Sequence, residues 1–345
     1  MVSVYDIFPR YVATASDRES QALSRSTRAT MPAQLEAHMT QPHPTPTEEE
    51  VLGYIDSCSN WGRWGPDDDA GTVNLITPQK RIEAAGLVRN GRAVSLAYPL
   101  NTQGGPGNAN PAQHFIRTTA GAAVDYIGIL FHGYATTHVD ALCHIFWEGK
   151  MWNGRDSSQV LSTGARAGAV DAWSLGLTTR GVLLDIPRLR GEPSVTLDKP
   201  IRGWELEAAA EREGVELRPG DAVIVYGGRN AFYGANPGSV PGARPTPGVH
   251  VDCIPVLHKH DAALLGWDML DAGPSGYEQF DTRAAGGPVH VLAIVYMGLP
   301  LLDNARLEPL AEACAEENRW EFMLTINPLN VRGGTGSPVN PIALF

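Results

Sequence analysis

Apolar segments alternate with amphipathic helices along the second half of the chain, and this alternation constrains the fold more than any other feature. The segments at 181–189, 219–228 and 322–329 are short apolar runs typical of buried strands. Helical periodicity occupies the chain between them, at 201–217 and again at 307–317. Since helices can cover the faces of a sheet built from such strands, the pattern predicts an α/β domain.

The composition is that of a folded, acidic protein. Hydrophobic residues make up 43% of the 345 residues and charged residues 19%, a mixture that disordered chains lack. The formal net charge of −11 disfavours binding to nucleic acids or to anionic lipids, because like charges repel. We therefore expect a small-molecule substrate, and neither nucleic acid nor membrane as a partner.

The sequence shows no signal for export or membrane insertion. No run approaches the roughly 18 apolar residues of a membrane helix, and the first 27 residues lack the apolar stretch of a signal peptide. The four cysteines lie far apart and form no CxxC pair, which suits free thiols in a reducing cytosol. A cytoplasmic protein is expected.

The N-terminal part of the chain differs from the rest. The stretch QPHPTPTEEE at 41–50 combines three prolines with an acidic run, which disfavours regular structure. We expect an N-terminal arm at 1–55, extended or partly ordered, followed by a single domain at 56–345. Within that domain, a strand is predicted at 92–100 and a long loop, rich in Gly, Asn and Pro, at 101–120.

The densest group of potential metal ligands is HGYATTHVDALCH at 132–144. In an extended strand, alternate residues face the same way, so five of these side chains would share one face. They are His132, Tyr134, Thr136, His138 and Asp140. His144 would return to the same point if the chain turns after Asp140. Imidazole and carboxylate groups together suit Zn²⁺ or Mn²⁺ with an open position for water.

Two simpler explanations remain open for this segment: histidines can satisfy buried hydrogen bonds, and a His–Asp pair can be a plain salt bridge. Three histidines, a tyrosine and an aspartate within 13 positions of an apolar segment nevertheless favour a functional site. Burying so many polar groups costs free energy unless something organises them.

These residues resemble a signature of the cyclase family, whose members include bacterial kynurenine formamidases and isatin hydrolases. His138, Asp140 and His144, in the pattern T-H-x-D-A-x-x-H, resemble the signature HxGTHxDxPxH. The later stretch at 290–310 resembles the family's second element, a histidine followed by an acidic residue. In this sequence that pair is His290 and Asp303.

The resemblance implies a swivelling β/β/α domain with a mixed sheet, assembled as a homodimer or homotetramer, and a site for one or two divalent metal ions. It implies that His138 and Asp140 bind the first ion. In the two-metal formamidases, Asp140 would bridge to a second ion held by His144, His290 and Asp303. In the single-metal isatin hydrolases, the residue matching His144 is instead a nearby acid or base.

The sequence departs from the signature at four positions. Tyr134 stands where the family has its first histidine ligand, and Asp303 replaces a glutamate. Thr136 and Leu142 replace a glycine and a proline. His132 is the expected substitute ligand, since it lies two residues earlier on the same predicted strand face. Tyr134 would otherwise donate a hydrogen bond to a developing oxyanion.

We therefore predict a metal-dependent hydrolase that opens a cyclic or aryl amide, lactam or lactone with a metal-activated water, acting on non-peptide C–N bonds or lactone esters. His144 would be the acid and base. Trp64 would line an aromatic substrate pocket, and Arg229, after a buried strand, would bind a substrate carboxylate. Two alternatives remain open: a cyclase or dehydratase that closes a ring, and a non-catalytic member of the fold that only binds its ligand.

Overall fold

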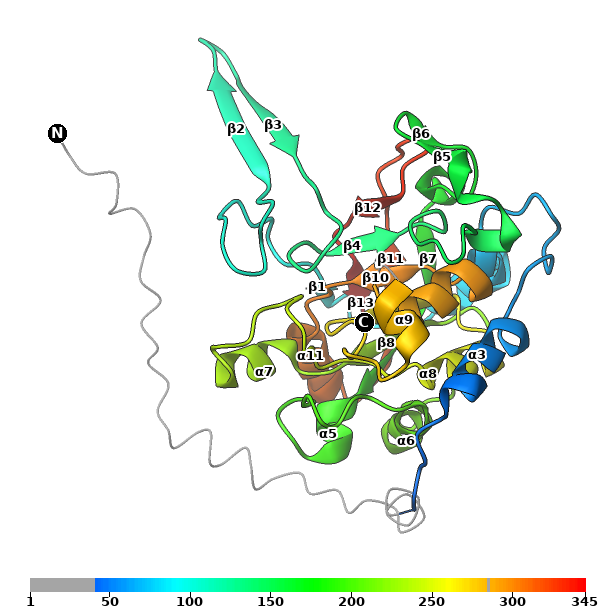
Figure 1. Cartoon of the computed structure of the whole chain (residues 1–345). Helices are drawn as coiled ribbons and strands as arrows, with labels where there is room; N and C mark the ends of the chain where they lie inside the picture. Colours follow the sequence, from blue (N-terminus) through cyan, green and yellow to red (C-terminus); the bar gives the residue numbers. More distant parts are fainter. Residues whose placement is uncertain (1–40, 284–285) are drawn as a thin grey trace. The chain divides into compact units, whose positions relative to one another are not determined.

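The computed structural model describes residues 41–283 and 286–345 (Figure 1). Most of the predicted N-terminal arm, residues 1–40, lies outside the described residues. The rest of it is partly helical, because helix α3, Glu48–Ser57, crosses the predicted boundary at residue 55. The Thr47 side chain accepts a hydrogen bond from the Glu50 amide, and the Glu50 carboxylate accepts one from the Thr47 amide. This capping box starts the helix.

A nine-stranded mixed sheet lies at the centre of the domain and confirms the predicted α/β class (Figure 1). Its strand order is β1-β13-β11-β7-β8-β9-β10-β4-β12. Strands β7 to β10 run parallel, and antiparallel strands flank them on both sides. The strands are β1 (Ala93–Ser95), β4 (His138–Asp140), β7 (Leu177–Asp185), β8 (Ala222–Tyr226), β9 (Leu264–Trp267), β10 (Leu301–Asp303), β11 (Glu321–Ile326), β12 (Gly336–Pro338) and β13 (Ile342–Leu344).

Helices connect the parallel strands, as parallel pairing requires. Helices α5 and α6 come between β7 and β8, α7 and α8 between β8 and β9, and α9, α10 and the π-helix η5 between β9 and β10. The bounds are α4 (Pro78–Ala85), α5 (Ile186–Arg190), α6 (Gly203–Glu213), α7 (Arg229–Ala235), α8 (Cys253–Lys259), α9 (Glu278–Arg283), α10 (Pro288–His290), η5 (Val291–Met297) and α11 (Glu308–Glu317). Among the described residues, no helix is long and apolar enough to cross a membrane.

The central strands are buried along their length. Every residue of β9 and the first four residues of β8 are buried, as expected for strands covered on both faces. Trp152, Trp173 and Trp267 are among the largest fully buried side chains around them. This packed sheet gives strands β4 and β10, which carry the candidate site, a rigid support.

Two predictions near the start of the domain are wrong in extent. The strand predicted at 92–100 covers only Ala93–Ser95. The loop predicted at 101–120 stops at residue 112, because β2 (Gln113–Thr118) pairs there with β3 (Ala123–Gly128). The Gly, Asn and Pro residues that indicated a loop lie mostly before β2.

The strand predicted at 181–189 begins earlier and ends earlier than its apolar residues indicate. β7 ends at Asp185, and α5 follows at once. The Asp185 carboxylate accepts a hydrogen bond from the Arg188 amide and so caps the helix. Pro187 has no amide hydrogen for a strand ladder but fits the first turn of a helix.

Gly71→Ala is expected to lower the free energy of unfolding by about 2–4 kcal/mol. Gly71 has a φ of 61°, and a Cβ there would overlap the carbonyl oxygen of Gly298. Gly53→Ala is the matched control, since nothing lies within 4 Å of the added Cβ and alanine favours helix α3. Urea denaturation followed by tryptophan fluorescence measures both variants. Equal midpoints would contradict the steric argument.

Candidate metal centre

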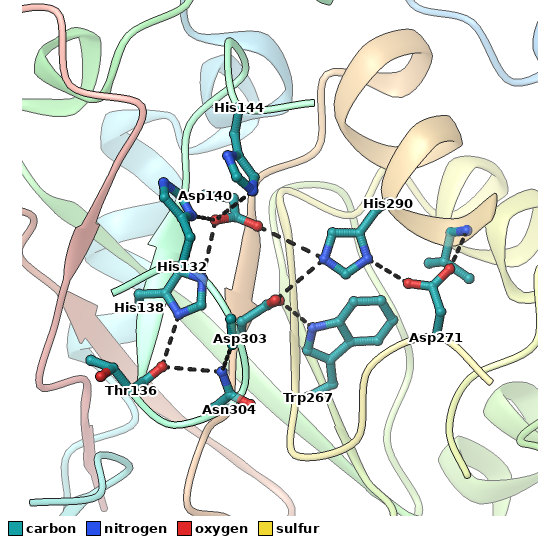
Figure 2. Close-up of polar contacts among 12 residues, drawn as sticks. His132, Thr136, His138, Asp140, His144, Trp267, Asp271, His290, Asp303 and Asn304 are labelled. Atoms are coloured by element: carbon teal, nitrogen blue, oxygen red, sulfur yellow. Dashed lines mark hydrogen bonds and ion pairs between the residues drawn. The ribbon is translucent and has the colours of Figure 1, made fainter. Parts of the chain in front are cut away.

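Strand β4 places two predicted ligands side by side. His138 and Asp140 alternate on the strand, so their side chains point to the same face of the sheet (Figure 2). Antiparallel pairing with β10 sets Asp303 opposite His138. His138 and Asp140 are each only 1% exposed. The sheet therefore brings one imidazole and two carboxylates together in a buried position.

The strand predicted for residues 132–140 forms only over its last three residues. β4 covers His138–Asp140, while residues 132–136 form turns in which Gly133 has a φ of 125°. His132 still reaches the site from this turn, with Nδ1 2.9 Å from Asp140 Oδ1. The Tyr134 side chain is 37% exposed instead.

The orientation of His138 is set by the backbone. Its Nδ1 lies 2.8 Å from the carbonyl oxygen of Thr136, so Nδ1 carries the proton and donates. Its Nε2 lies 3.3 Å from Asp140 Oδ1. In the neutral imidazole, the lone pair on Nε2 is therefore directed at the same point as the carboxylate, as metal-ligating histidines require.

Three buried atoms at this point make no hydrogen bond among the described residues: His132 Nδ1 and both carboxylate oxygens of Asp140. The approach of His132 to Asp140 has the distance of an ion pair without hydrogen-bond geometry. Leaving a buried carboxylate without donors is costly. Ligand atoms of His132, His138 and Asp140 all lie within 4.8 Å of one another. These residues fit a divalent cation.

A second group of ligands shares Asp140. Ligand atoms of Asp140, His290 and Asp303 also lie within 4.8 Å of one another. His290 Nε2 is 3.3 Å from Asp303 Oδ2 and 3.9 Å from Asp140 Oδ2 (Figure 2). Asp140 thus belongs to both groups, whereas His144, which the two-metal interpretation assigns to the second ion, is not a member of the second group.

Two side chains that sequence reasoning missed hold the second group in place. His290 Nδ1 forms a short hydrogen bond with Asp271, which also accepts the Val289 amide hydrogen at 2.7 Å. Trp267 Nε1 donates to Asp303 Oδ1 at 2.5 Å. Trp267 ends the buried strand β9 and Asp271 follows it. The sequence signal that could have found both residues is their position, because polar side chains at the carboxyl end of a parallel strand lie where such folds place ligand groups.

His144 lies against the first group. The chain turns after Asp140, which is the condition for His144 to return to the site, and the His144 ring stacks on His132 with centroids 3.7 Å apart. Its Nε2 is 3.9 Å from Asp140 Oδ1. Burial, only partly offset by the charge of Asp140, lowers the pKa of His144 to about 4. His144 is therefore neutral at pH 7 and can accept a proton or bind a metal.

His138 and His290 differ from His144, because the pKa of each is raised. Burial alone would lower the pKa of His138, but Asp140 and Asp303 outweigh it and raise the pKa to about 9. Burial is likewise outweighed at His290, where Asp271 and Asp303 raise the pKa well above its usual value. A cation would have to displace these protons, so metal binding would release protons.

Arg229 follows the buried strand β8, as predicted, but its guanidinium is hydrogen-bonded within the protein. Its guanidinium donates to the backbone oxygens of Asp268 and Tyr134 and to Asn304 Oδ1, and the residue is only 8% exposed. Asn304 in turn donates to the carbonyls of Gly133 and Thr136. Arg229 and Asn304 together hold the turn that carries His132, so the guanidinium serves the protein rather than a substrate carboxylate.

Trp64 has a different place from the one predicted. It packs against Trp152, with ring centroids 6.3 Å apart, and the guanidinium of Arg63 lies over its ring. Trp64 is one of the partly buried side chains at the edge of the hydrophobic core. In the described part of the chain, its ring contacts involve no predicted metal ligand.

Tyr134 lines a cavity beside the metal ligands. The cavity measures about 260 Å³ and is bounded by His132, Tyr134, Phe131, Asn108 and Pro241 among others. Burial raises the pKa of the Tyr134 phenol, so its hydroxyl stays protonated at neutral pH. A second cavity of about 460 Å³ shares Tyr134 and Pro241 with the first.

The chain belongs to the cyclase family: the family model described as "Putative cyclase" matches residues 74–274, more than half of the chain. The resemblance drawn from the His-Asp-His pattern is thereby confirmed. The chain is also similar to the crystal structure of a novel cyclase, with 28% identity and a TM-score of 0.73. That match covers 84% of this chain and 99% of the other. No match is found among curated proteins.

Two isatin hydrolases share the fold at lower identity. One, bound to the product analogue thioisatinate, is 18% identical with a TM-score of 0.52, over 78% of this chain and 99% of that one. Isatin hydrolase A from Labrenzia aggregata, bound to benzyl benzoate, is 17% identical with a TM-score of 0.52, over 75% and 94% of the two chains. At these identities the likeness is one of fold.

Asp140→Ala is expected to abolish metal binding, because Asp140 belongs to both ligand groups. Protein purified without a metal-affinity tag is analysed by inductively coupled plasma mass spectrometry, before and after reconstitution with Zn²⁺ or Mn²⁺. His260→Ala is the matched control, since His260 pairs with Glu207 and belongs to neither group. A metal content that is equal in the Asp140→Ala and control proteins would contradict the assignment.

Asp271→Asn is expected to weaken metal binding at the second group by about 10- to 100-fold while leaving the first group intact. The asparagine keeps the size of the side chain but removes the charge that orients His290. Titration calorimetry of the metal-free protein with Zn²⁺ separates the two events, with Asp198→Asn, an exposed carboxylate, as the control. An unchanged affinity for Zn²⁺ at the second group would show that Asp271 does not support metal binding there.

Proposed function

We propose that this protein is a metal-dependent hydrolase that opens a cyclic or aryl amide, lactam or lactone. The observation that carries the proposal is the buried Asp140 carboxylate, whose two oxygens have no hydrogen-bond donor among the described residues and face two groups of ligands. The isatin hydrolases that share the fold act on a cyclic substrate by their printed names, which supports a ring-opening reaction.

His132, His138 and Asp140 would hold the ion, with His290 and Asp303 available for a second one. A divalent cation in such a site lowers the pKa of water and polarises a carbonyl group. The protein's contribution is to keep the ligands buried and oriented, through Thr136 at His138 and through the turn held by Arg229.

His144 is the candidate acid and base. Its neutral imidazole can take a proton from the attacking water as the new C–O bond forms. It then returns the proton to the leaving nitrogen or oxygen as the C–N or C–O bond breaks. The Tyr134 hydroxyl, protonated and beside the same cavity, can donate a hydrogen bond to the developing oxyanion.

The cavities beside the site favour an uncharged substrate. Their polar lining includes the amide groups of four asparagines, Asn101, Asn108, Asn110 and Asn230, beside Tyr98, His132, Tyr134 and Thr136. The one cation among the lining residues is Arg229, whose guanidinium is already hydrogen-bonded within the protein. A small neutral ring with amide or ester oxygens therefore fits better than a free carboxylate.

Hydrolysis of a panel of N-formyl arylamines, lactams and lactones by metal-loaded protein tests the proposal, with product formation followed by liquid chromatography. Asp140→Asn is expected to abolish turnover, and His144→Ala to lower kcat by about 10²- to 10⁴-fold. Asp198→Asn is expected to retain full activity. Accumulation of the closed ring from an open acid would instead assign the ring-closing reaction, and ligand binding without turnover of any substrate would make the protein a binding module.

A further inference from the structure

A hydroxyl group from the C-terminal part of the chain contacts His132, the ligand that stands in for the first histidine of the signature. His132 Nε2 lies 3.0 Å from Oγ1 of Thr335, although the two residues are 203 positions apart in the sequence. Thr335 directly precedes strand β12, which pairs with β4 and sets Gly336 opposite Asp140. The sheet therefore brings this hydroxyl group to the edge of the candidate metal centre.

The backbone around Thr335 is fixed by hydrogen bonds to two other segments. The Thr335 carbonyl accepts the Ala141 amide hydrogen at 3.0 Å. The Gly334 carbonyl accepts the Val170 amide hydrogen at 2.9 Å. Because Ala141 directly follows Asp140, the Thr335 hydroxyl has a defined position relative to the metal ligands.

Packing also fixes the His132 ring. The ring stacks on His144 with an interplanar angle of 4°. A Cβ at Gly336 would lie only 3.0 Å from His132 Cε1, so the edge of the ring lies close to the backbone of β12. In this orientation Nδ1 is directed at Asp140 and Nε2 at Thr335. Both ring nitrogens therefore face an oxygen atom.

The proton of the neutral His132 ring belongs on Nε2. Nδ1 lies 2.9 Å from Asp140 Oδ1 but without hydrogen-bond geometry, so a proton on Nδ1 would have no acceptor among the described residues. A proton on Nε2 has the Thr335 hydroxyl oxygen as its acceptor. The lone pair of Nδ1 is then directed toward Asp140, as a metal-binding histidine requires.

His138 uses the opposite nitrogen. Its Nδ1 donates to the Thr136 carbonyl, and its Nε2 faces Asp140. The two imidazole rings are perpendicular, with centroids 5.2 Å apart, and approach the same carboxylate oxygen (Figure 2). Each ring thus has one nitrogen hydrogen-bonded to a neighbouring oxygen and the other free for a cation.

We propose that Thr335 is a positioning residue of the metal centre: its hydroxyl accepts the Nε2 proton of His132 and so presents Nδ1 as a metal ligand. The proposal rests on the metal-dependent function proposed above. It accounts for the way in which His132 replaces the histidine that the signature has in the place of Tyr134. Thr335 acts through His132 and is not itself a ligand.

Thr335→Val tests the proposal, because valine keeps the shape of the side chain and lacks the hydroxyl. Titration calorimetry of the metal-free protein is expected to show Zn²⁺ affinity at the first group lowered by about 10- to 100-fold, with the second group unchanged. Asp271→Asn should give the opposite pattern. Thr335→Ser, which keeps a hydroxyl, is expected to restore the wild-type affinity. Thr325→Val is the matched control, since the Thr325 hydroxyl contacts the Ile342 carbonyl on another part of the sheet.

A measurement on the wild-type protein does not depend on how the variants fold. Long-range ¹H–¹⁵N correlation spectra of the zinc-loaded protein, labelled at histidine, identify the protonated nitrogen of each ring, and His132→Gln assigns the His132 signals. The His132 proton is expected on Nε2 and the His138 proton on Nδ1.

Three results would overturn the role of Thr335 while leaving the metal-dependent function in place. They are a His132 proton on Nδ1, a wild-type Zn²⁺ affinity in Thr335→Val, and an affinity in Thr335→Ser as low as that in Thr335→Val. A wild-type protein that binds no Zn²⁺ would overturn both proposals.

Discussion

The buried carboxylate of Asp140 is the constraint on which the site depends. It is 1% exposed, and the imidazoles of His132, His138, His144 and His290 approach it from four positions in the sequence. Burial would raise the pKa of this carboxyl, but the neighbouring histidine side chains hold it well below its usual value. An ionised carboxylate in the interior is stable only when positive charge compensates it. The neighbouring histidines, or a cation shared with them, provide that charge.

The surrounding fold holds Asp140 and the neighbouring histidines in position. β4 lies between β10 and β12, so the backbone that carries Asp140 is hydrogen-bonded on both sides. Arg229 and Asn304 hold the turn of His132, and Asp271 holds His290. His132 and His290 thus each depend on a further residue for their direction, which is a condition for a preorganised metal site.

Much of this could be predicted from the sequence, because it depends on short-range patterns. The alternation of apolar strands and helices indicated the α/β class, and the spacing of His138, Asp140 and His144 required only a strand followed by a turn. Contacts between distant segments could not be predicted in this way. Asp271 and Asn304 act through residues far from them in the sequence, and Arg229 had no visible partner. The hairpin was missed because neither strand alternates buried and exposed residues.

The central claim is that the two ligand groups around Asp140 form a metal centre. Anomalous X-ray scattering measured above and below the zinc and manganese absorption edges, from crystals of protein purified without added chelator and reconstituted with each metal, tests it most directly. The account predicts an anomalous peak within coordination distance of His132, His138 and Asp140, with a second peak at His290 and Asp303 if two ions bind. Crystals with no peak at Asp140, or with a peak only at other residues, would contradict it.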